Sequence, residues 1–187
     1  MAGGQFQCGI TSGIVLDCTG KGQLGGLNRR VFVGNIKDLE DLPYTISAEG
    51  YYEAINLRTY GFLYEFIGQK FAHTSGDNVE RNEGGSVNYP HTVTLKLIDA
   101  TPADSSVIEE MTAADVFVVV ETNNQKFKIY GYQNGLTISE APQDSGNAAS
   151  ADTTRTITLS GNEVGLAKEF LITDYATTVA LLESYVG

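Results

Sequence analysis

The sequence predicts a mainly β protein, a β-barrel or β-sandwich with one long hairpin and one α-helix on its flank. Three observations lead to this fold class. Segments of alternating apolar and polar residues recur along the chain, turn residues separate them, and one stretch near residues 101–114 has helical periodicity. The chain of 187 residues is long enough to bury a core. We expect an N-terminal arm over residues 1–28, a β domain over 29–170 and a C-terminal segment over 171–187.

The long hairpin is expected over residues 61–99, with His73 opposite His91. In this register one face is mostly apolar, because side chains alternate along a strand, and it pairs Phe71 with Val93 and Ile67 with Leu97. The other face is small or polar and contains Gly68, Lys70, Ala72, Thr92, Thr94 and Lys96. The tip from Ser75 to Tyr89 is too long for a tight turn, and loops of that size are usually functional or disordered.

Further strands are expected in segments with apolar alternation or a continuous apolar run, namely 29–36, 51–58, 115–122, 126–131, 136–139 and 153–160. Turns are expected at Asn123-Asn124 and at Gly161-Asn162, after which residues 163–170 pair back or leave the domain.

One helix is expected over about 104–114, and a second segment has apolar residues at mixed spacing, some of which fit a helix. Asp104 or Ser105 would cap the first helix, and its apolar residues are Val107, Ile108, Met111 and Ala114. In the second segment, 171–186, the residues that fit a helix are Val179, Leu182 and Val186. Whether this segment packs on its own subunit or on a neighbour is left open.

Charge and hydropathy argue against two classes of partner. The formal net charge of -11 and the pI near 4.5 argue against stable binding of nucleic-acid phosphates, which requires a basic patch. No segment approaches the roughly 20 apolar residues of a membrane helix, and the first residues lack the pattern of a secretory signal. We therefore expect a soluble protein that is made in the cytoplasm and has no membrane partner.

The search for catalytic and metal-binding motifs is largely negative. Cys8 and Cys18 are expected to be reduced thiols, and they lie too far in sequence from His73 and His91 to suggest a zinc site. Gly20, Gly22 and Gly25 spell G-x-G-x-x-G, but they lead into a strand and not into the helix that a dinucleotide fold requires.

No catalytic residue, metal ligand or cofactor is therefore expected. The two histidines are interpreted as a half-exposed cross-strand pair, with a pH-sensitive contact as the alternative. Carboxylate pairs such as Glu109-Glu110 are interpreted as solvated surface, although a glycosidase pair assembled by folding remains open.

The order of several features resembles the tail tube proteins of tailed phages, especially a group in phages and prophages of Bacteroidetes. The resemblance covers roughly residues 8–165. Its N-terminal part is Cys8, then Asp17-Cys18, then Gly25-Gly26 before the strand residues 30–33. Its later parts are the strand Tyr89 to Leu97, a helix, the tract KIYGYQNGLTI and the closing TITLSGNE.

The resemblance implies a structural protein of the virion that is not an enzyme. Such a fold, which is similar to that of the tube protein of type VI secretion systems, closes with copies of itself into rings, commonly hexameric. The rings stack into a hollow tail tube, which contacts other tail proteins and conducts DNA without specific binding. We expect contacts between rings from the hairpin loop, through Asp77, Glu80, Arg81 and Glu83. The residues expected to face the lumen are Lys70, Thr92, Thr94 and Lys96.

Two other function classes remain open at this point. The first is another virion component, such as a capsid decoration protein or a head-to-tail connector, which would share the β-rich and motif-free character. The second is a soluble β-rich enzyme or binding module, for which a concave pocket with a carboxylate cluster would argue.

Overall fold

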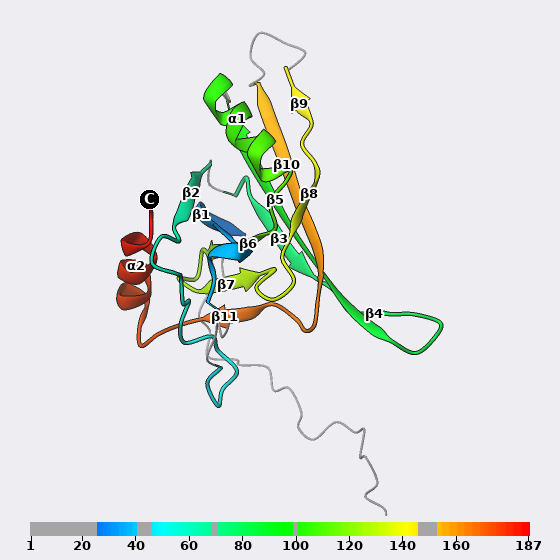
Figure 1. The fold of residues 1–187 in the computed structure, drawn as a ribbon, viewed down its shortest axis with the longest axis vertical. Coiled ribbons are helices and arrows are strands. Elements are labelled where there is room, and N and C mark those ends of the chain that lie inside the picture. Colours follow the sequence, from blue (N-terminus) through cyan, green and yellow to red (C-terminus); the bar gives the residue numbers. More distant parts are fainter. Residues whose placement is uncertain (1–25, 41–45, 69–70, 99–100, 146–152) are drawn as a thin grey trace, which may run out of the picture.

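The computed structural model describes residues 26–40, 46–68, 71–98, 101–145 and 153–187. The described part contains two antiparallel sheets and two α-helices (Figure 1). The elements in chain order are β1 (Leu27–Asn35), the 3-10 helix η1 (Ile36–Asp38), β2 (Leu63–Ile67), β3 (Thr74–Asp77), β4 (Glu80–Arg81), β5 (Val87–Ile98), α1 (Pro102–Met111), β6 (Val116–Thr122), β7 (Phe127–Tyr130), β8 (Thr137–Glu140), β9 (Gln143–Asp144), β10 (Thr154–Glu163), β11 (Lys168–Phe170) and α2 (Tyr175–Ser184).

The two sheets pack face to face, which confirms the mainly β, sandwich-like prediction. Sheet 1 has the order β11-β7-β6-β1-β2, and sheet 2 has the order β3-β5-β10-β8, with β4 paired to β5 and β9 paired to β10. Alternate residues of both sheets form the core between them, including Val31, Val118, Val93 and Leu159. Each sheet keeps two edge strands, so the subunit is an open sandwich and not a closed barrel.

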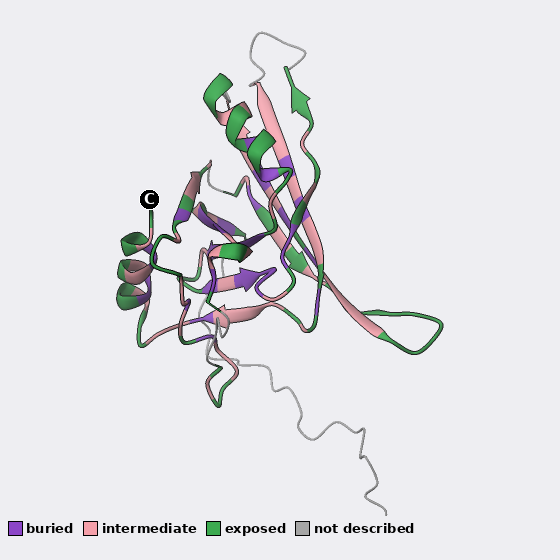
Figure 2. Cartoon of the chain, in the orientation of Figure 1, coloured by how far each residue is buried: buried purple, intermediate pink, exposed green. Residues whose placement is uncertain are grey.

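Sheet 1 is covered on both faces, and its central strand shows why the sequence there is continuously apolar. Residues Val116–Glu121 of β6 are all buried (Figure 2). One face of the sheet meets sheet 2. On the other face Phe117 and Val119 belong to a second apolar cluster, which includes Leu182 of α2 and, from the chain before β2, Leu39, Tyr52 and Ile55. A strand enclosed on both sides loses the alternation of a half-exposed strand.

Helix α1 overlaps the predicted helix of about 104–114 but begins two residues earlier, at a different cap, and ends at Met111. Thr101 is the N-cap, and its hydroxyl accepts a hydrogen bond from the Asp104 N–H while the Asp104 carboxylate accepts from the Thr101 N–H. The prediction of Asp104 or Ser105 as the cap was therefore wrong. Thr101 is the N-cap because Asp104, three residues later, completes a reciprocal capping box with it.

The long hairpin exists, but its predicted arms and register were wrong. Residues Leu63–Ile67 form β2, which pairs with β1 in sheet 1, and the chain then crosses to sheet 2, where β3 pairs with β5. His91 lies opposite Asp77, four residues beyond the predicted partner His73. An even shift leaves the same side chains on each face, so alternation alone does not distinguish the two registers.

Two other expectations are corrected, and one alternative that the sequence left open is resolved. Residues 51–58 do not form a strand; Tyr52 makes only isolated bridges to Ile46 and Phe170. Gly161-Asn162 is not a turn, because β10 continues in register with β5 as far as Glu163. Residues 168–170 then form β11 and join sheet 1 beside β7.

The C-terminal segment packs on its own subunit, which settles the point that the sequence left open. It forms α2, a second helix in addition to the one expected on the flank. Leu182 is fully buried and Val179 packs beside it, whereas Val186 follows the helix and is partly exposed.

Candidate functional site

The outer face of sheet 2 is a surface of hydroxyl groups. In β5 and β10 the odd-numbered residues Val93, Leu95, Ile157 and Leu159 are buried, so the even-numbered residues face outward. The pairing brings these outward residues into rows across the four strands, one of which is Thr74, Thr94, Thr158 and Glu140. We call this surface the hydroxyl face, and its other hydroxyl residues are Thr92, Thr137, Thr154, Thr156 and Ser160.

The hydroxyl face has few charges. Among the described residues of β3, β5, β8, β9 and β10, the register places Lys96, Glu140 and Asp144 on it. The predicted lumen residues Thr92, Thr94 and Lys96 therefore lie on one face, as expected from alternation. Lys70 lies outside the described residues. The predicted partners of these residues, Gly68 and Ala72, are not opposite them; Thr74 and Gly76 are.

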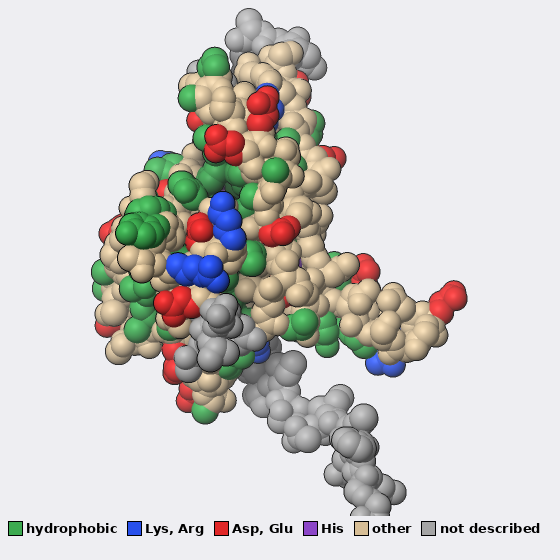
Figure 3. All heavy atoms as spheres, in the orientation of Figure 1, with side chains coloured by type: hydrophobic (Ala, Val, Ile, Leu, Met, Phe, Trp, Pro, Cys, Tyr) green, Lys and Arg blue, Asp and Glu red, His purple; other side chains and the backbone are tan. Residues whose placement is uncertain are grey.

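The hairpin beyond the core is the second feature. β5 continues past the edge of the sandwich and pairs with β4, so a two-stranded ribbon projects from the body (Figure 3). Asn82 and Ser86 close its tip through the Asn82 N–H and the Ser86 carbonyl, at 2.9 Å, and Gly85 supplies a φ of 84°. The predicted long loop is thus an ordered ribbon with a short turn, because the shifted register extends the pairing outward.

The four predicted contact residues divide into two groups. Glu80, Arg81 and Glu83 lie on the exposed ribbon, with their side chains in solvent. Asp77 lies at its root instead, where its carboxylate accepts a hydrogen bond from the Ala167 N–H at 3.1 Å. Asp77 therefore fixes the segment before β11 against β3 and is not presented at the tip.

Both histidines are buried, so their interpretation as a half-exposed pair was wrong. His73 is 1% exposed and His91 is 3% exposed. His91 shares the inward parity of Val93 and Leu95, and this sequence signal was sufficient to place it inside. His73 does not face His91; its Nδ1 accepts a hydrogen bond from the Lys96 N–H at 3.2 Å.

His91 connects the two sheets. Its Nδ1 accepts a hydrogen bond from the Gly131 N–H at 3.2 Å, and its Nε2 donates to the Gly165 carbonyl at 3.0 Å. This pattern requires the neutral ring with the proton on Nε2. Burial lowers the pKa of His91, an effect that Glu163, the Gly165 carbonyl and Asp77 oppose.

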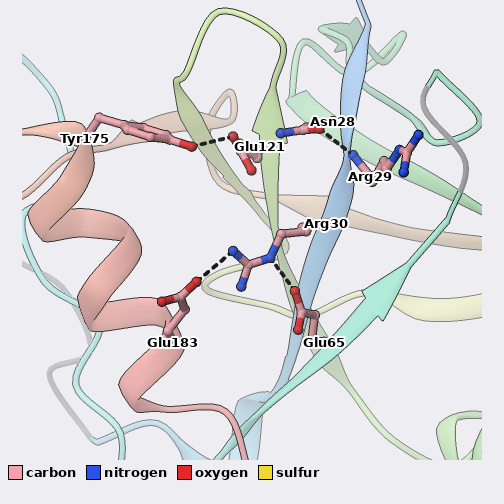
Figure 4. A network of polar contacts seen from close by, with 7 residues as sticks. All are labelled: Asn28, Arg29, Arg30, Glu65, Glu121, Tyr175 and Glu183. Atoms are coloured by element: carbon pink, nitrogen blue, oxygen red, sulfur yellow. Dashed lines mark hydrogen bonds and ion pairs between the residues drawn. The ribbon is translucent and has the colours of Figure 1, made fainter.

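Polar contacts hold α2 on sheet 1 (Figure 4). Arg30 of β1 binds Glu65 of β2 and, through Nη1 at 2.8 Å, Glu183 of α2. The Tyr175 hydroxyl donates to the buried Glu121 carboxylate at 2.7 Å. Burial of the Tyr175 hydroxyl, and to a smaller extent its contact with Glu121, raises the pKa of Tyr175 to about 12. The helix is thus held on sheet 1 by polar contacts as well as by the buried Leu182.

The described residues contain no group of three or more His, Cys, Asp or Glu side chains that could hold a metal ion. A cavity of about 190 Å³ lies beside His91 and Glu163, but the Glu163 carboxylate accepts hydrogen bonds from the backbone N–H groups of Gln133 and Asn134. The Glu163 carboxylate thus holds the loop before β8. Within the same residues, none of the helices is long and apolar enough to cross a membrane.

Cys8 and Cys18 lie outside the described residues. Comparisons with family models, with curated proteins and with solved structures each gave no match.

Proposed function

We propose that this protein is the building block of a phage tail tube, a virion structural protein that self-assembles into stacked rings around a channel for DNA. The observation that carries the proposal is the hydroxyl face. A polar surface extends over four paired strands, and the sheet beneath it ends in open edges at β3 and β8.

Open edges supply a way to form a ring. An exposed edge strand offers unpaired N–H and C=O groups, which normally lead to aggregation unless another strand covers them. When the contact is head to tail and the rotation closes, β3 of one copy and β8 of the next produce a ring. In such a ring sheet 2 becomes a segment of a larger barrel, and the hydroxyl face lines the inside.

The chemistry of the hydroxyl face suits a passage for DNA. Affinity for DNA phosphates comes mainly from Lys and Arg side chains that displace counterions. Hydroxyl groups form hydrogen bonds with water and displace no counterions, so they add little affinity for DNA phosphates. With Lys96 offset by Glu140 and Asp144, a lumen made of this face is wet and does not retain a polyanion.

The projecting ribbon supplies contacts between rings. An isolated two-stranded hairpin is marginally stable in water, and this ribbon extends where its own subunit does not cover it. A neighbouring ring would bury Val79, which is 51% exposed, and would pair with the charges of Glu80, Arg81 and Glu83.

The test is electron microscopy of the purified full chain, combined with labelling of single cysteines. In a background with Cys8→Ser and Cys18→Ser, we compare Thr92→Cys on the hydroxyl face with Tyr60→Cys, whose parent side chain is 86% exposed in the loop before β2. We expect rings or tubes. In the assemblies a long-chain PEG-maleimide modifies position 60 and not position 92, whereas a small maleimide modifies both.

Dissociated subunits are the control, because there the PEG reagent should reach both positions. A protein that stays monomeric at high concentration contradicts the proposal. Assemblies in which the PEG reagent modifies position 92 as fast as position 60 contradict the placement of the hydroxyl face in the lumen.

A further inference from the structure

β2 is an edge strand of sheet 1, and its outward backbone groups can be identified from the ladder. The Gly68 N–H donates to the Arg29 carbonyl at 2.9 Å, so the even-numbered residues of this segment bond to β1. In an antiparallel ladder the intervening residues direct their N–H and C=O groups away from that partner. Leu63, Glu65 and Ile67 therefore present these groups at the free edge.

Only the first of these three positions is occupied within the described part of the chain. The Leu63 N–H donates to the Tyr185 carbonyl at 2.8 Å, and its carbonyl accepts from the Gly187 N–H at 3.2 Å. The corresponding groups of Glu65 and Ile67 have no backbone partner among the described residues. An extended segment can bond there.

An apolar groove runs beside the same edge. Two adjoining cavities of about 430 and 290 Å³ lie between β2 and α1, and both are lined by Tyr64, Phe66 and Val107. Tyr64 is 48% exposed and Val107 is 44% exposed, and on the opposite face of β2 Ile67 is 64% exposed. The free edge thus has apolar side chains on both faces.

We infer that this groove and edge bind an extended segment of the same chain, Ile14-Val15-Leu16, as an additional strand beside β2. This is β-augmentation, in which backbone bonds supply affinity and alternate side chains enter pockets. The inference is independent of the proposed function, because it concerns a different sheet and a contact within one subunit.

The length of the chain before the described residues, and the place where the described residues begin, support this occupant. Residues 1–25 precede β1 in the sequence, and Arg30 near the start of β1 pairs with Ile67, so the described chain begins near the open end of the β2 edge. The ten residues from Leu16 to Gly26 span at most about 33–36 Å when extended. The whole of β2 is about 17 Å long, so the segment can reach any position along it.

The residue pattern fits a strand that is covered on both faces. Residues 1–25 contain one run of three consecutive aliphatic side chains, Ile14-Val15-Leu16. In a strand Ile14 and Leu16 point to one face, toward the groove, and Val15 points to the other, toward Ile67. Short continuous apolar runs are typical of strands enclosed on both sides.

The charges that line the groove give no strong preference for a charged occupant. Glu65 is bound to Arg30, and the Asp104 carboxylate accepts hydrogen bonds in the cap of α1. The other two charged residues, Lys37 and Glu110 in the second cavity, have opposite signs.

Amide hydrogen exchange of the full chain, measured by NMR, tests the contact. We expect slow exchange at Glu65 and Ile67, and at least tenfold faster exchange when Ile14→Asp and Leu16→Asp are introduced together. Val107→Asp should have the same effect, because it places a charge in the groove. The matched control Val164→Asp, at a site that is 64% exposed and lies between β10 and β11, should leave both amides protected.

Crosslinking identifies which copy supplies the segment. In a background with Cys8→Ser and Cys18→Ser, Leu16→Cys is combined with Val107→Cys or, as control, with Val164→Cys, and a short bis-maleimide is added. We expect a crosslink within one chain for position 107 and none for position 164. Crosslinks between chains would show a second copy in the groove and overturn the inference. So would equal crosslinking at both positions, no crosslinking, or fast exchange of Glu65 and Ile67 in the unaltered chain.

Discussion

His91 shows how one residue fixes the relation between the two sheets. It lies on β5, its Nδ1 accepts from Gly131 beyond β7, and its Nε2 donates to Gly165 in the segment that leads to β11. A second proton on Nδ1 would remove the first bond, because a protonated nitrogen cannot accept. The burial that lowers the pKa of His91 therefore has a consequence for stability.

Stability should fall as the pH drops through the ordinary titration range of histidine. The pKa values of His73 and His91 are lowered in the folded state, so between those values and about 6.5 the unfolded chain binds more protons. The contribution of the neutral rings to the free energy of unfolding is therefore complete above about pH 6.5, and it is lost as the pH falls below that value. We expect a lower Tm at about pH 5.5 than at about pH 7.5. His91→Gln should reduce this difference, because glutamine can accept and donate in the same places without titrating. Thermal unfolding at both pH values measures this, and an equal drop in both proteins would contradict it.

The elements differ in how far the sequence determines them. The strands at residues 29–36, 115–122 and 153–160 were predictable because a continuous or alternating apolar pattern reports burial directly. The partner of β2 was not, because alternation has a period of two and Ile67 fits a strand in either sheet. The burial of His91 could have been predicted from its parity with Val93, whereas that of His73 depends on the crossing between sheets.

The hairpin ribbon is an element whose tip can be removed without touching the core. Glu80 and Asn88 form a pair of the ladder, so replacing residues 81–87 by Asn-Gly leaves them flanking a two-residue turn of the favoured type. We expect the free energy of unfolding to change by less than about 1 kcal/mol, since the removed residues are at the surface. We expect the stacking of rings to be lost in electron micrographs.

A variant carrying Arg81→Gln and Glu83→Gln serves as the matched control, because it keeps the length of the ribbon and removes the two charges nearest the tip. If it still forms tubes, length and backbone shape matter more than these charges. Normal tubes from the shortened variant would contradict the assignment of the ribbon to contacts between rings.

At the scale of the whole molecule, charge opposes assembly. Each copy has a formal net charge of -11, so copies that come together repel one another. The Debye length falls from about 10 Å at 0.1 M salt to about 3 Å at 1 M. We expect the concentration needed for ring formation to decrease as salt is raised over this range, as measured by light scattering. The opposite trend would show that ion pairs, such as those available to Glu80 and Arg81, dominate the contact.

Only part of the candidate site could be predicted from the sequence, because alternation determines the faces of one strand but not the order of strands in a sheet. The outward placement of Thr92, Thr94 and Lys96 follows from alternation within one strand. The hydroxyl face as a whole could not be derived, because it requires β10 to lie beside β5 and β8 beside β10, and the order of strands in a sheet is set by packing. The same limit applies to α2, because Val179, Leu182 and Val186 fit a helix but do not identify the surface that the helix covers.

The continuity of β5 has a mechanical consequence. The strand runs from the ribbon into sheet 2 without a break, and β10 pairs with it from Tyr89 to Ile98. A pull on the ribbon along the strand direction loads these hydrogen bonds together in shear, because they lie perpendicular to the strands. Force applied at the tip is thereby distributed over the hydrogen bonds of the sheet that bears the hydroxyl face, and the ribbon transmits it directly to the core.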